Sequence, residues 1–257
     1  MSHRYHYRPP RADHPLLASA PFAHAAAPEV LPPSVDLRRL CLPVRDQGQE
    51  GACSGFSASA WREVSHAAAA GSPLPGWLSP AYLYARTRIE EGTFPQDAGG
   101  SIADEFFILQ NFGVCPDSVL LYTGDPTEGP TPVSDVAAVP FRLAPPLQVT
   151  IEEIAVKSAL ANSQAVSIGF TVYESFETPD ASGVVPLPNT AREQMLGGHG
   201  VLVVGYDDAA QHWIVRNSWG AGWGDGGYVY MPYGYETLWN GVDRGGDELT
   251  TTVKSAT

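Results

Sequence analysis

One cysteine stands where a helix is expected to begin, and it is the first candidate for chemistry in this sequence. Cys53 is flanked by small residues, and an alanine-rich apolar run continues from Phe56 to Gly71 and Pro73. This pattern predicts a buried helix with Cys53 in its first turn. The positive end of the helix dipole favours thiolate, the form of cysteine that attacks a carbonyl carbon. A single cysteine is more often a small buried hydrophobic residue, so the assignment depends on its partners.

A nucleophilic cysteine needs a base, and His199 is the histidine that fits. Four of the seven histidines lie in the proline-rich N-terminal segment. His66 follows Cys53 by thirteen residues on the predicted helix, so its backbone lies about 20 Å away at ~1.5 Å per residue. His212 follows a polar turn between two apolar runs, which predicts a solvent-facing hairpin. His199 remains, set among glycines and directly before an expected buried strand at 201–206.

The returning strand of this hairpin brings a third polar side chain toward the base. Residues 212–217 (HWIVRN) are expected to run antiparallel to 201–206. With the turn at 207–211, Asn217 returns to the level of His199, and its side-chain oxygen can orient the imidazole. Cysteine, base and orienting group form the set that nucleophilic catalysis requires.

The order and context of these residues resemble the papain-like cysteine peptidases, particularly bacterial members. The shared features are a QG element six residues before the cysteine, the cysteine at a helix start, a histidine between small residues, and NSWGAGWGDGGY at 217–228. Shorter matches are SVDLR (34–38), PVRDQG (43–48), AGG (98–100) and GV (113–114). The resemblance implies an α+β fold of two halves, a helical one and a β-barrel-like one, with the active site in the cleft between them.

The resemblance also implies a role for each matching residue. Cys53 would be the nucleophile, His199 its base, Asn217 the residue that orients the base, and Gln47 a donor in the oxyanion hole. The backbone of Gly99 and Gly100 would pair with extended substrate, and Gly198 would leave space in the main specificity pocket. Trp219 and Trp223 would shield the asparagine, and Trp219 would also belong to the substrate-binding residues. Together they imply a cysteine endopeptidase that acts on peptides or proteins without a metal or cofactor.

Three positions depart from the family pattern. Ser54 stands where most relatives have a tryptophan, and Glu50 and Asp97 replace the two cysteines of a family disulfide. Both cysteines are missing, so the whole disulfide is absent rather than half of it. Cys41 and Cys115 are most simply unpaired. Two alternatives stay open. The same apparatus could transfer the acyl group to an amine, as in an amidase-like or transglutaminase-like enzyme, or, with Ser54 in place of tryptophan, the chain could be a catalytically weak binding module.

The chain is expected to divide into an N-terminal extension at 1–34 and a peptidase domain at 35–257. The domain would be mostly helical over about 35–140 and rich in strands over about 147–257, joined by the crossover at 124–146, which contains six prolines. Helix starts are predicted at Ser79-Pro80, at Ser101 with Asp104, and at Thr150 with Glu153. Further strands are expected at 165–170 and 228–231.

The N-terminal extension has two open interpretations. It could be a disordered tail, or it could be a short pro-segment that lies over the cleft and inhibits the enzyme. In the second case the apolar stretch LLASAPF (16–22) could occupy a groove built for extended peptide.

Composition and charge restrict the partners. The net charge of −13, with no basic stripe, argues against nucleic acid and anionic membranes. The chain has no apolar run of about 18 residues and no pattern typical of a secretory signal, so we expect a soluble protein. We also expect a monomer. It would be cytoplasmic or exported by a non-classical route.

Overall fold

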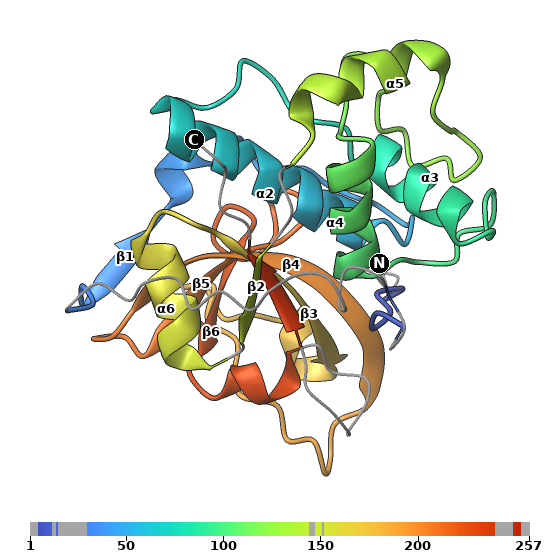
Figure 1. Ribbon diagram of the computed structural model, residues 1–257. Coiled ribbons are helices and arrows are strands. Elements are labelled where there is room, and N and C mark those ends of the chain that lie inside the picture. The colour runs from blue at the N-terminus through green and yellow to red at the C-terminus, as the bar shows by residue number, and fades with distance from the viewer. Residues whose placement is uncertain are drawn as a thin grey trace.

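Most of the helices lie on one side of the molecule and the strands lie on the other (Figure 1). The computed structural model describes residues 5–11, 14, 30–143, 147–150, 152–239 and 249–252. The helical side contains α2 (Cys53–Ala70), α3 (Pro80–Glu90), α4 (Ile102–Asn111) and α5 (Pro132–Ala138). The other side contains the sheet and α6 (Glu153–Ala161). Four short 3-10 turns connect these elements: η1 (Arg38–Leu40), η2 (Val139–Phe141), η3 (Glu174–Glu177) and η4 (Tyr235–Leu238). This is the predicted α+β architecture.

The sheet is antiparallel and is organised around one long strand, β4. Its strands are β1 (Ser34–Asp36), β2 (Leu147–Thr150), β3 (Val166–Tyr173), β4 (Met195–Asp207), β5 (His212–Arg216), β6 (Tyr228–Pro232) and β7 (Leu249–Thr252). Their order is β2-β7-β3-β4-β5-β6, and β1 also pairs with β4. The register sets His199 opposite Phe170 and Leu202 opposite Arg216. The candidate base therefore lies inside a paired strand with its backbone fixed on the β3 side.

The long helix α2 lies between the sheet and the other helices. Its first three turns are buried on almost every side, which is why small residues alternate there with Phe56 and Trp61. On one side the Trp61 indole donates to the carbonyl of Ala165 (3.0 Å), beside β3. On the other side a Cβ at Gly55 would lie 2.8 Å from the Pro80 carbonyl oxygen, so α3 requires glycine at this contact. The helix ends at Gly71, whose φ of +76° is a left-handed conformation.

Two of the predicted helix starts are correct. The Ser79 hydroxyl accepts a hydrogen bond from the Tyr82 N–H (3.1 Å), and the Ser101 hydroxyl accepts one from the Asp104 N–H (3.1 Å). The capping box predicted at Thr150 and Glu153 is wrong: α6 begins after Glu152, and no side chain caps it.

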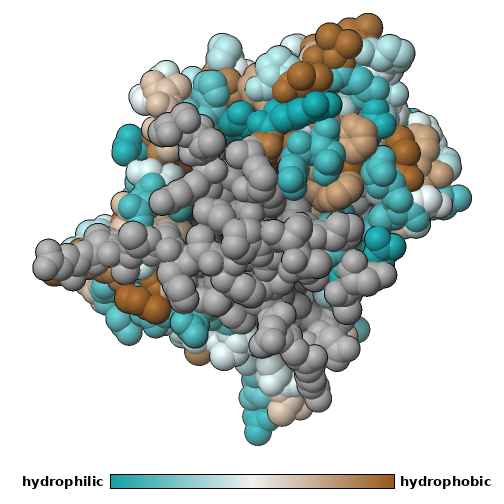
Figure 2. Space-filling model, in the orientation of Figure 1, coloured by the Kyte–Doolittle hydropathy of each residue, from teal (hydrophilic) through white to brown (hydrophobic). Residues whose placement is uncertain are grey.

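The proline-rich crossover is more structured than expected. It contains α5, which begins with a reciprocal capping box in which Thr131 and Ser134 each accept a hydrogen bond from the other's backbone N–H. Pro132 takes the first helical position, where its missing N–H costs nothing. The outer face of α5 exposes Val133 and Val136, and Figure 2 shows a hydrophobic patch over this helix. Within the described ranges, no helix is long and apolar enough to cross a bilayer.

Candidate active site

Cys53 is the first residue of α2 and is fully buried. The strand that carries His199 packs directly against this helix start. A Cβ at Gly200 would lie 3.3 Å from the Cys53 carbonyl carbon. Burial raises the pKa of Cys53 to about 11, outweighing the N–H donors of Gly200 and Ser54 that lower it. Burial therefore opposes the thiolate that the helix dipole was expected to favour.

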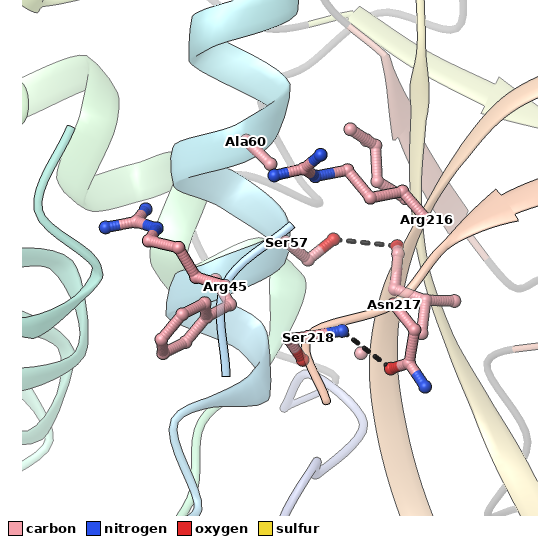
Figure 3. A pocket seen from close by; sticks show the side chains of 10 residues that line it. Arg45, Ser57, Ala60, Arg216, Asn217 and Ser218 are labelled. Atoms are coloured by element: carbon pink, nitrogen blue, oxygen red, sulfur yellow. Dashed lines mark hydrogen bonds between the residues drawn. The ribbon is translucent and has the colours of Figure 1, made fainter. Parts of the chain in front are cut away.

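His199 is fully buried and is oriented by Asn217, where the hairpin prediction places it. His199 Nε2 lies 2.8 Å from Asn217 Oδ1. The same oxygen accepts a hydrogen bond from the Ser218 N–H (2.8 Å), which Figure 3 shows. A backbone N–H can donate only to the oxygen of the asparagine amide, so the Ser218 N–H fixes which amide atom faces His199. Because that atom is an oxygen, which accepts, the hydrogen of the bond must be on His199 Nε2. The ring therefore presents Nδ1 for exchange with another group.

Aromatic rings cover the imidazole. Trp219 stacks on His199 with a centroid distance of 4.8 Å and an interplanar angle of 27°. Trp223 meets Trp219 edge-on at 4.9 Å. Sequence reasoning missed Phe170 and Phe176, whose ring centroids lie 5.9 and 6.4 Å from that of the imidazole. The register between 165–170 and the His199 strand is the signal that could have identified Phe170.

Gln47 is fixed to the residue that follows Asn217. Its backbone N–H donates to the Ser218 carbonyl (2.8 Å), and its side-chain oxygen accepts from the Ser218 hydroxyl (2.6 Å). One hydrogen of its amide group is directed to the Glu50 carbonyl, with an Nε2–O distance of 3.0 Å. The second amide hydrogen is left for a further acceptor.

Polar contacts connect the loops that a disulfide joins in most relatives. The Gly51 N–H donates to Asp97 Oδ1 (3.0 Å), and the Tyr84 hydroxyl donates to the same oxygen (2.6 Å). Glu50 faces the buried Arg88 guanidinium at 3.6 Å. Burial alone would raise the pKa of Asp97, but hydrogen bonds from Tyr84 and Gly51 and the nearby His6 imidazole at 3.7 Å lower it well below its usual range. Asp97 is therefore a carboxylate. All three cysteines of the chain are free.

Residues 5–8 lie in the region where substrate was expected to pair. The Tyr7 N–H donates to the Gly198 carbonyl and the Arg8 N–H donates to the Gly100 carbonyl, each at 3.0 Å. The Arg8 side chain reaches the Gly99 carbonyl (3.1 Å) and the Glu91 carboxylate. Figure 1 shows this N-terminal segment beside α4, at the boundary with the strands. The three predicted substrate-binding glycines therefore meet one extended segment of the chain itself, whereas the expected occupant, 16–22, lies outside the described residues.

The Tyr7 ring fills a pocket whose walls are glycine. Tyr7 is only 4% exposed. A Cβ at Gly169 would lie 1.9 Å from its Cζ, and a Cβ at Gly198 would lie 2.5 Å from its carbonyl oxygen. Neither glycine can gain a side chain without displacing Tyr7.

A small polar cavity lies between α2 and the sheet, beside Asn217. Its volume is about 10 Å³, roughly the space of one water molecule, and its lining includes Arg45, Ser57 and Arg216. Figure 3 shows its lining residues between α2 and the strand that leads into Asn217. Hydrogen bonds cross the boundary here, as the Ser57 hydroxyl donates to the Val201 carbonyl (2.7 Å).

The sequence model of the family described as "Papain family cysteine protease" matches residues 31–242. The chain belongs to this family. Among solved structures it is similar to xylellain, a cysteine protease from Xylella fastidiosa, with a TM-score of 0.85 and 26% identity over 98% of this chain and 96% of that one. It is also similar to the cysteine protease CMS1MS2 of Carica candamarcensis, solved in complex with E-64, with a TM-score of 0.66 and 25% identity over 88% of this chain and all of that one.

Curated papain-family relatives include a plant enzyme and a viral protein. The chain is 31% identical to the thiol protease aleurain of Arabidopsis thaliana, over 82% of this chain and 59% of that protein. It is 29% identical to the uncharacterized peptidase C1-like protein L477 of Acanthamoeba polyphaga mimivirus, over 81% of this chain and 71% of the viral protein. The chain thus spans about three-fifths of the plant relative's length.

Proposed function

We propose that this protein is a cysteine endopeptidase whose domain at 35–257 hydrolyses peptide bonds with Cys53 as nucleophile and His199 as base. The observation that carries the proposal is the hydrogen bond between His199 Nε2 and Asn217 Oδ1. His199 lies on β4, and the next residue of that strand, Gly200, packs against the backbone of Cys53. This arrangement leaves Nδ1 of the imidazole as the atom that exchanges a proton with sulfur.

The chemistry follows from that arrangement. His199 takes the thiol proton, and the Cys53 sulfur attacks the substrate carbonyl carbon. The imidazolium then gives the proton to the leaving amine, and water hydrolyses the thioester with His199 again acting as base. The aromatic cover of Trp219 excludes water from the bond between His199 and Asn217, which preserves the orientation of the ring through both steps.

The negative oxygen of the tetrahedral intermediate needs donors that are already in place. The Cys53 N–H lies at a helix start, where backbone N–H groups have no partner within the helix. The second hydrogen of the Gln47 amide is the other donor, and Ser218 and Glu50 fix that amide in position.

Residues 5–8 act in this proposal as an autoinhibitory segment. They pair with Gly198 and Gly100 through the backbone, and Tyr7 occupies the pocket over Gly169. A peptide substrate needs the same backbone groups, so it competes with this segment. The low exposure of Cys53 and its raised pKa are also consistent with an active site that is covered.

Labelling of the thiol tests both parts of the proposal. Full-length protein, the Tyr7→Ala/Arg8→Ala variant and Cys53→Ala are treated with E-64, an epoxysuccinyl inhibitor, and analysed by intact mass. We expect one adduct per chain, formed faster in the double variant and absent in Cys53→Ala. An unchanged labelling rate in the double variant would contradict autoinhibition. The absence of any adduct on reduced protein would contradict the assignment of Cys53.

Product analysis separates hydrolysis from its alternatives. With a peptide substrate and added amine, the endopeptidase yields free carboxyl products by mass spectrometry. Predominant amide products would favour an acyl-transferring enzyme, and no turnover with intact labelling of Cys53 would favour a binding module.

A further inference from the structure

A buried carboxyl group lies directly behind the residue that follows the nucleophile. Glu105, in the first turn of α4, has no exposed surface. Its Oε1 accepts a hydrogen bond from the Ser54 hydroxyl (2.8 Å). Ser54 occupies the position where most relatives have tryptophan, so a polar pair takes the place of a large ring. Neither residue is needed for the mechanism above.

This pair contacts both walls of the cleft. A Cβ at Gly100 would lie 2.9 Å from the Ser54 hydroxyl oxygen and 3.3 Å from Glu105 Oε1, so the pair supports the backbone that meets Arg8. A Cβ at Gly200 would lie 3.3 Å from both Cα and N of Ser54, so the strand of the base rests on the same residue. A shift of Glu105 would therefore move Ser54 and, with it, the start of α2.

The surroundings of Glu105 disfavour its charge. Within the described residues, no Lys, Arg or His forms an ion pair with it, and its Oε2 is buried without a hydrogen bond of normal geometry. Burial is the main cause that raises the pKa of Glu105 to about 8. The charges of Asp104 and Glu91 contribute to the rise, and polar contacts from Ser54 and Thr87 oppose it. His14 and Arg8 face those two acids rather than Glu105. Glu105 is therefore a neutral acid at neutral pH.

We propose that Glu105 is a positioning residue of the active site, which fixes Ser54 beneath Cys53 as a neutral acid and suppresses nucleophilic attack when it ionises. The proposal rests on the function proposed above. The electrostatic link is direct, because the charge of Glu105 raises the pKa of Cys53 and so opposes formation of the attacking thiolate. The proton that Glu105 loses passes to solvent, and no other reactant is involved.

The consequence is an alkaline limit on activity that originates in α4. As the pH rises through about 8, the carboxylate forms, the thiolate becomes less favourable and the rate falls. The substitution Glu105→Gln keeps the shape and the acceptor for Ser54 but cannot ionise. It should therefore retain the neutral-pH rate and move the alkaline limb to higher pH.

The test compares pH profiles from pH 5 to 10 for wild type, Glu105→Gln, Glu105→Leu and the control Glu90→Gln, an exposed carboxyl group on α3. Two readouts are used, kcat/KM on a peptide and the rate of Cys53 alkylation by iodoacetamide. We expect Glu105→Gln to lie within about threefold of wild type at pH 7, with its alkaline midpoint higher by about one pH unit or more. We expect Glu105→Leu to lower both rates at every pH through loss of the Ser54 contact, and Glu90→Gln to match wild type.

The outcomes are separable. An alkaline midpoint that is the same in wild type and Glu105→Gln in both readouts would overturn the proposal. If wild type fails to cleave peptides but its Cys53 is alkylated, the proposed function fails, and the alkylation profile still tests the role of Glu105. If Glu105→Leu fails to fold, the comparison of Glu105→Gln with Glu90→Gln remains decisive.

Discussion

The two sides of the active site are stabilised by different kinds of interaction. On the side of the base, His199, Asn217 and Trp219 are held by strand pairing, one short hydrogen bond and ring stacking. On the side of the nucleophile, carboxyl groups surround the start of α2, including Glu50, Asp97 and the neutral Glu105.

This difference has a consequence for regulation. Stacked rings and amide hydrogen bonds do not titrate, so the geometry of the base is independent of pH apart from the charge of the imidazole itself. The contacts of Asp97, Glu105 and Glu91 do titrate, and two of them also meet the N-terminal segment, since Asp97 lies 3.7 Å from His6 and Glu91 pairs with Arg8. The three departures from the family pattern, Glu50, Ser54 and Asp97, all lie on the side of the nucleophile, where carboxyl groups can titrate.

The largest expected effect tests the base side. The substitution His199→Ala should lower kcat by on the order of 10⁴-fold or more, because neither the thiol nor the leaving amine then has a proton partner. Asn217→Ala should lower kcat less, since the imidazole remains but loses its fixed orientation. Steady-state kinetics on a peptide measures both, with circular dichroism as the control for folding. Equal rates for wild type and His199→Ala would remove His199 from the mechanism.

A smaller loss is expected at the oxyanion donor. Gln47→Ala should lower kcat by about 10²–10³-fold, the usual cost of one such donor. Because Gln47 also contacts Ser218, Gln47→Glu is the matched control: it keeps the acceptor for the Ser218 hydroxyl but replaces the donor with a charge. Both variants should be slow if donation matters, whereas a fast Gln47→Glu would show that only the contact with Ser218 is required.

The next effect concerns specificity rather than rate. Gly169→Leu should exclude aromatic side chains from the pocket that Tyr7 fills, because even a Cβ there would overlap the ring. We expect kcat/KM to fall by about 10–200-fold for substrates with Tyr or Phe in this pocket, and much less for those with Ala. A peptide library read by mass spectrometry gives the ratio directly. An unchanged ratio would mean that substrate does not use the pocket of Tyr7.

The sequence was informative where local chemistry is decisive. The caps at Ser79 and Ser101, the end of α2 at Gly71 and the hairpin that returns Asn217 to His199 all follow from residues close to one another in the chain. These features are determined by turn residues and by the alternation of apolar and polar residues, and the structure has each of them at the predicted position.

The features that the sequence did not predict depend on contacts between distant segments of the chain. Residues 5–8 carry no local pattern, and their place is set by Gly100 and Gly198, which are far along the chain. The raised pKa of Cys53 comes mainly from burial, because the strand that carries Gly200 packs against the start of α2. Glu105 follows Asp104 in what looks like an ordinary acidic first turn, and only packing against α2 shows that it is buried. The helix α5 was missed because prolines were taken as loop, although Thr131-Pro132 is a helix start.

The last prediction measures the carboxyl side of the site through stability. The pKa of Glu105 rises from 4.5 in the unfolded chain to about 8 in the folded protein. The folded protein therefore favours the neutral acid, and the stability that this contributes is lost as the pH increases from 4.5 to about 8. The advantage of Glu105→Gln over wild type should therefore grow by up to about 1.4 kcal/mol for each pH unit in that window and level off above it. Urea unfolding at a series of pH values measures the slope, with Glu90→Gln as the control that should run parallel to wild type. A constant difference between Glu105→Gln and wild type from pH 5 to 8 would mean that Glu105 ionises as freely in the folded protein as in the unfolded chain. The polar pair behind Cys53 would then carry no pH dependence into the active site.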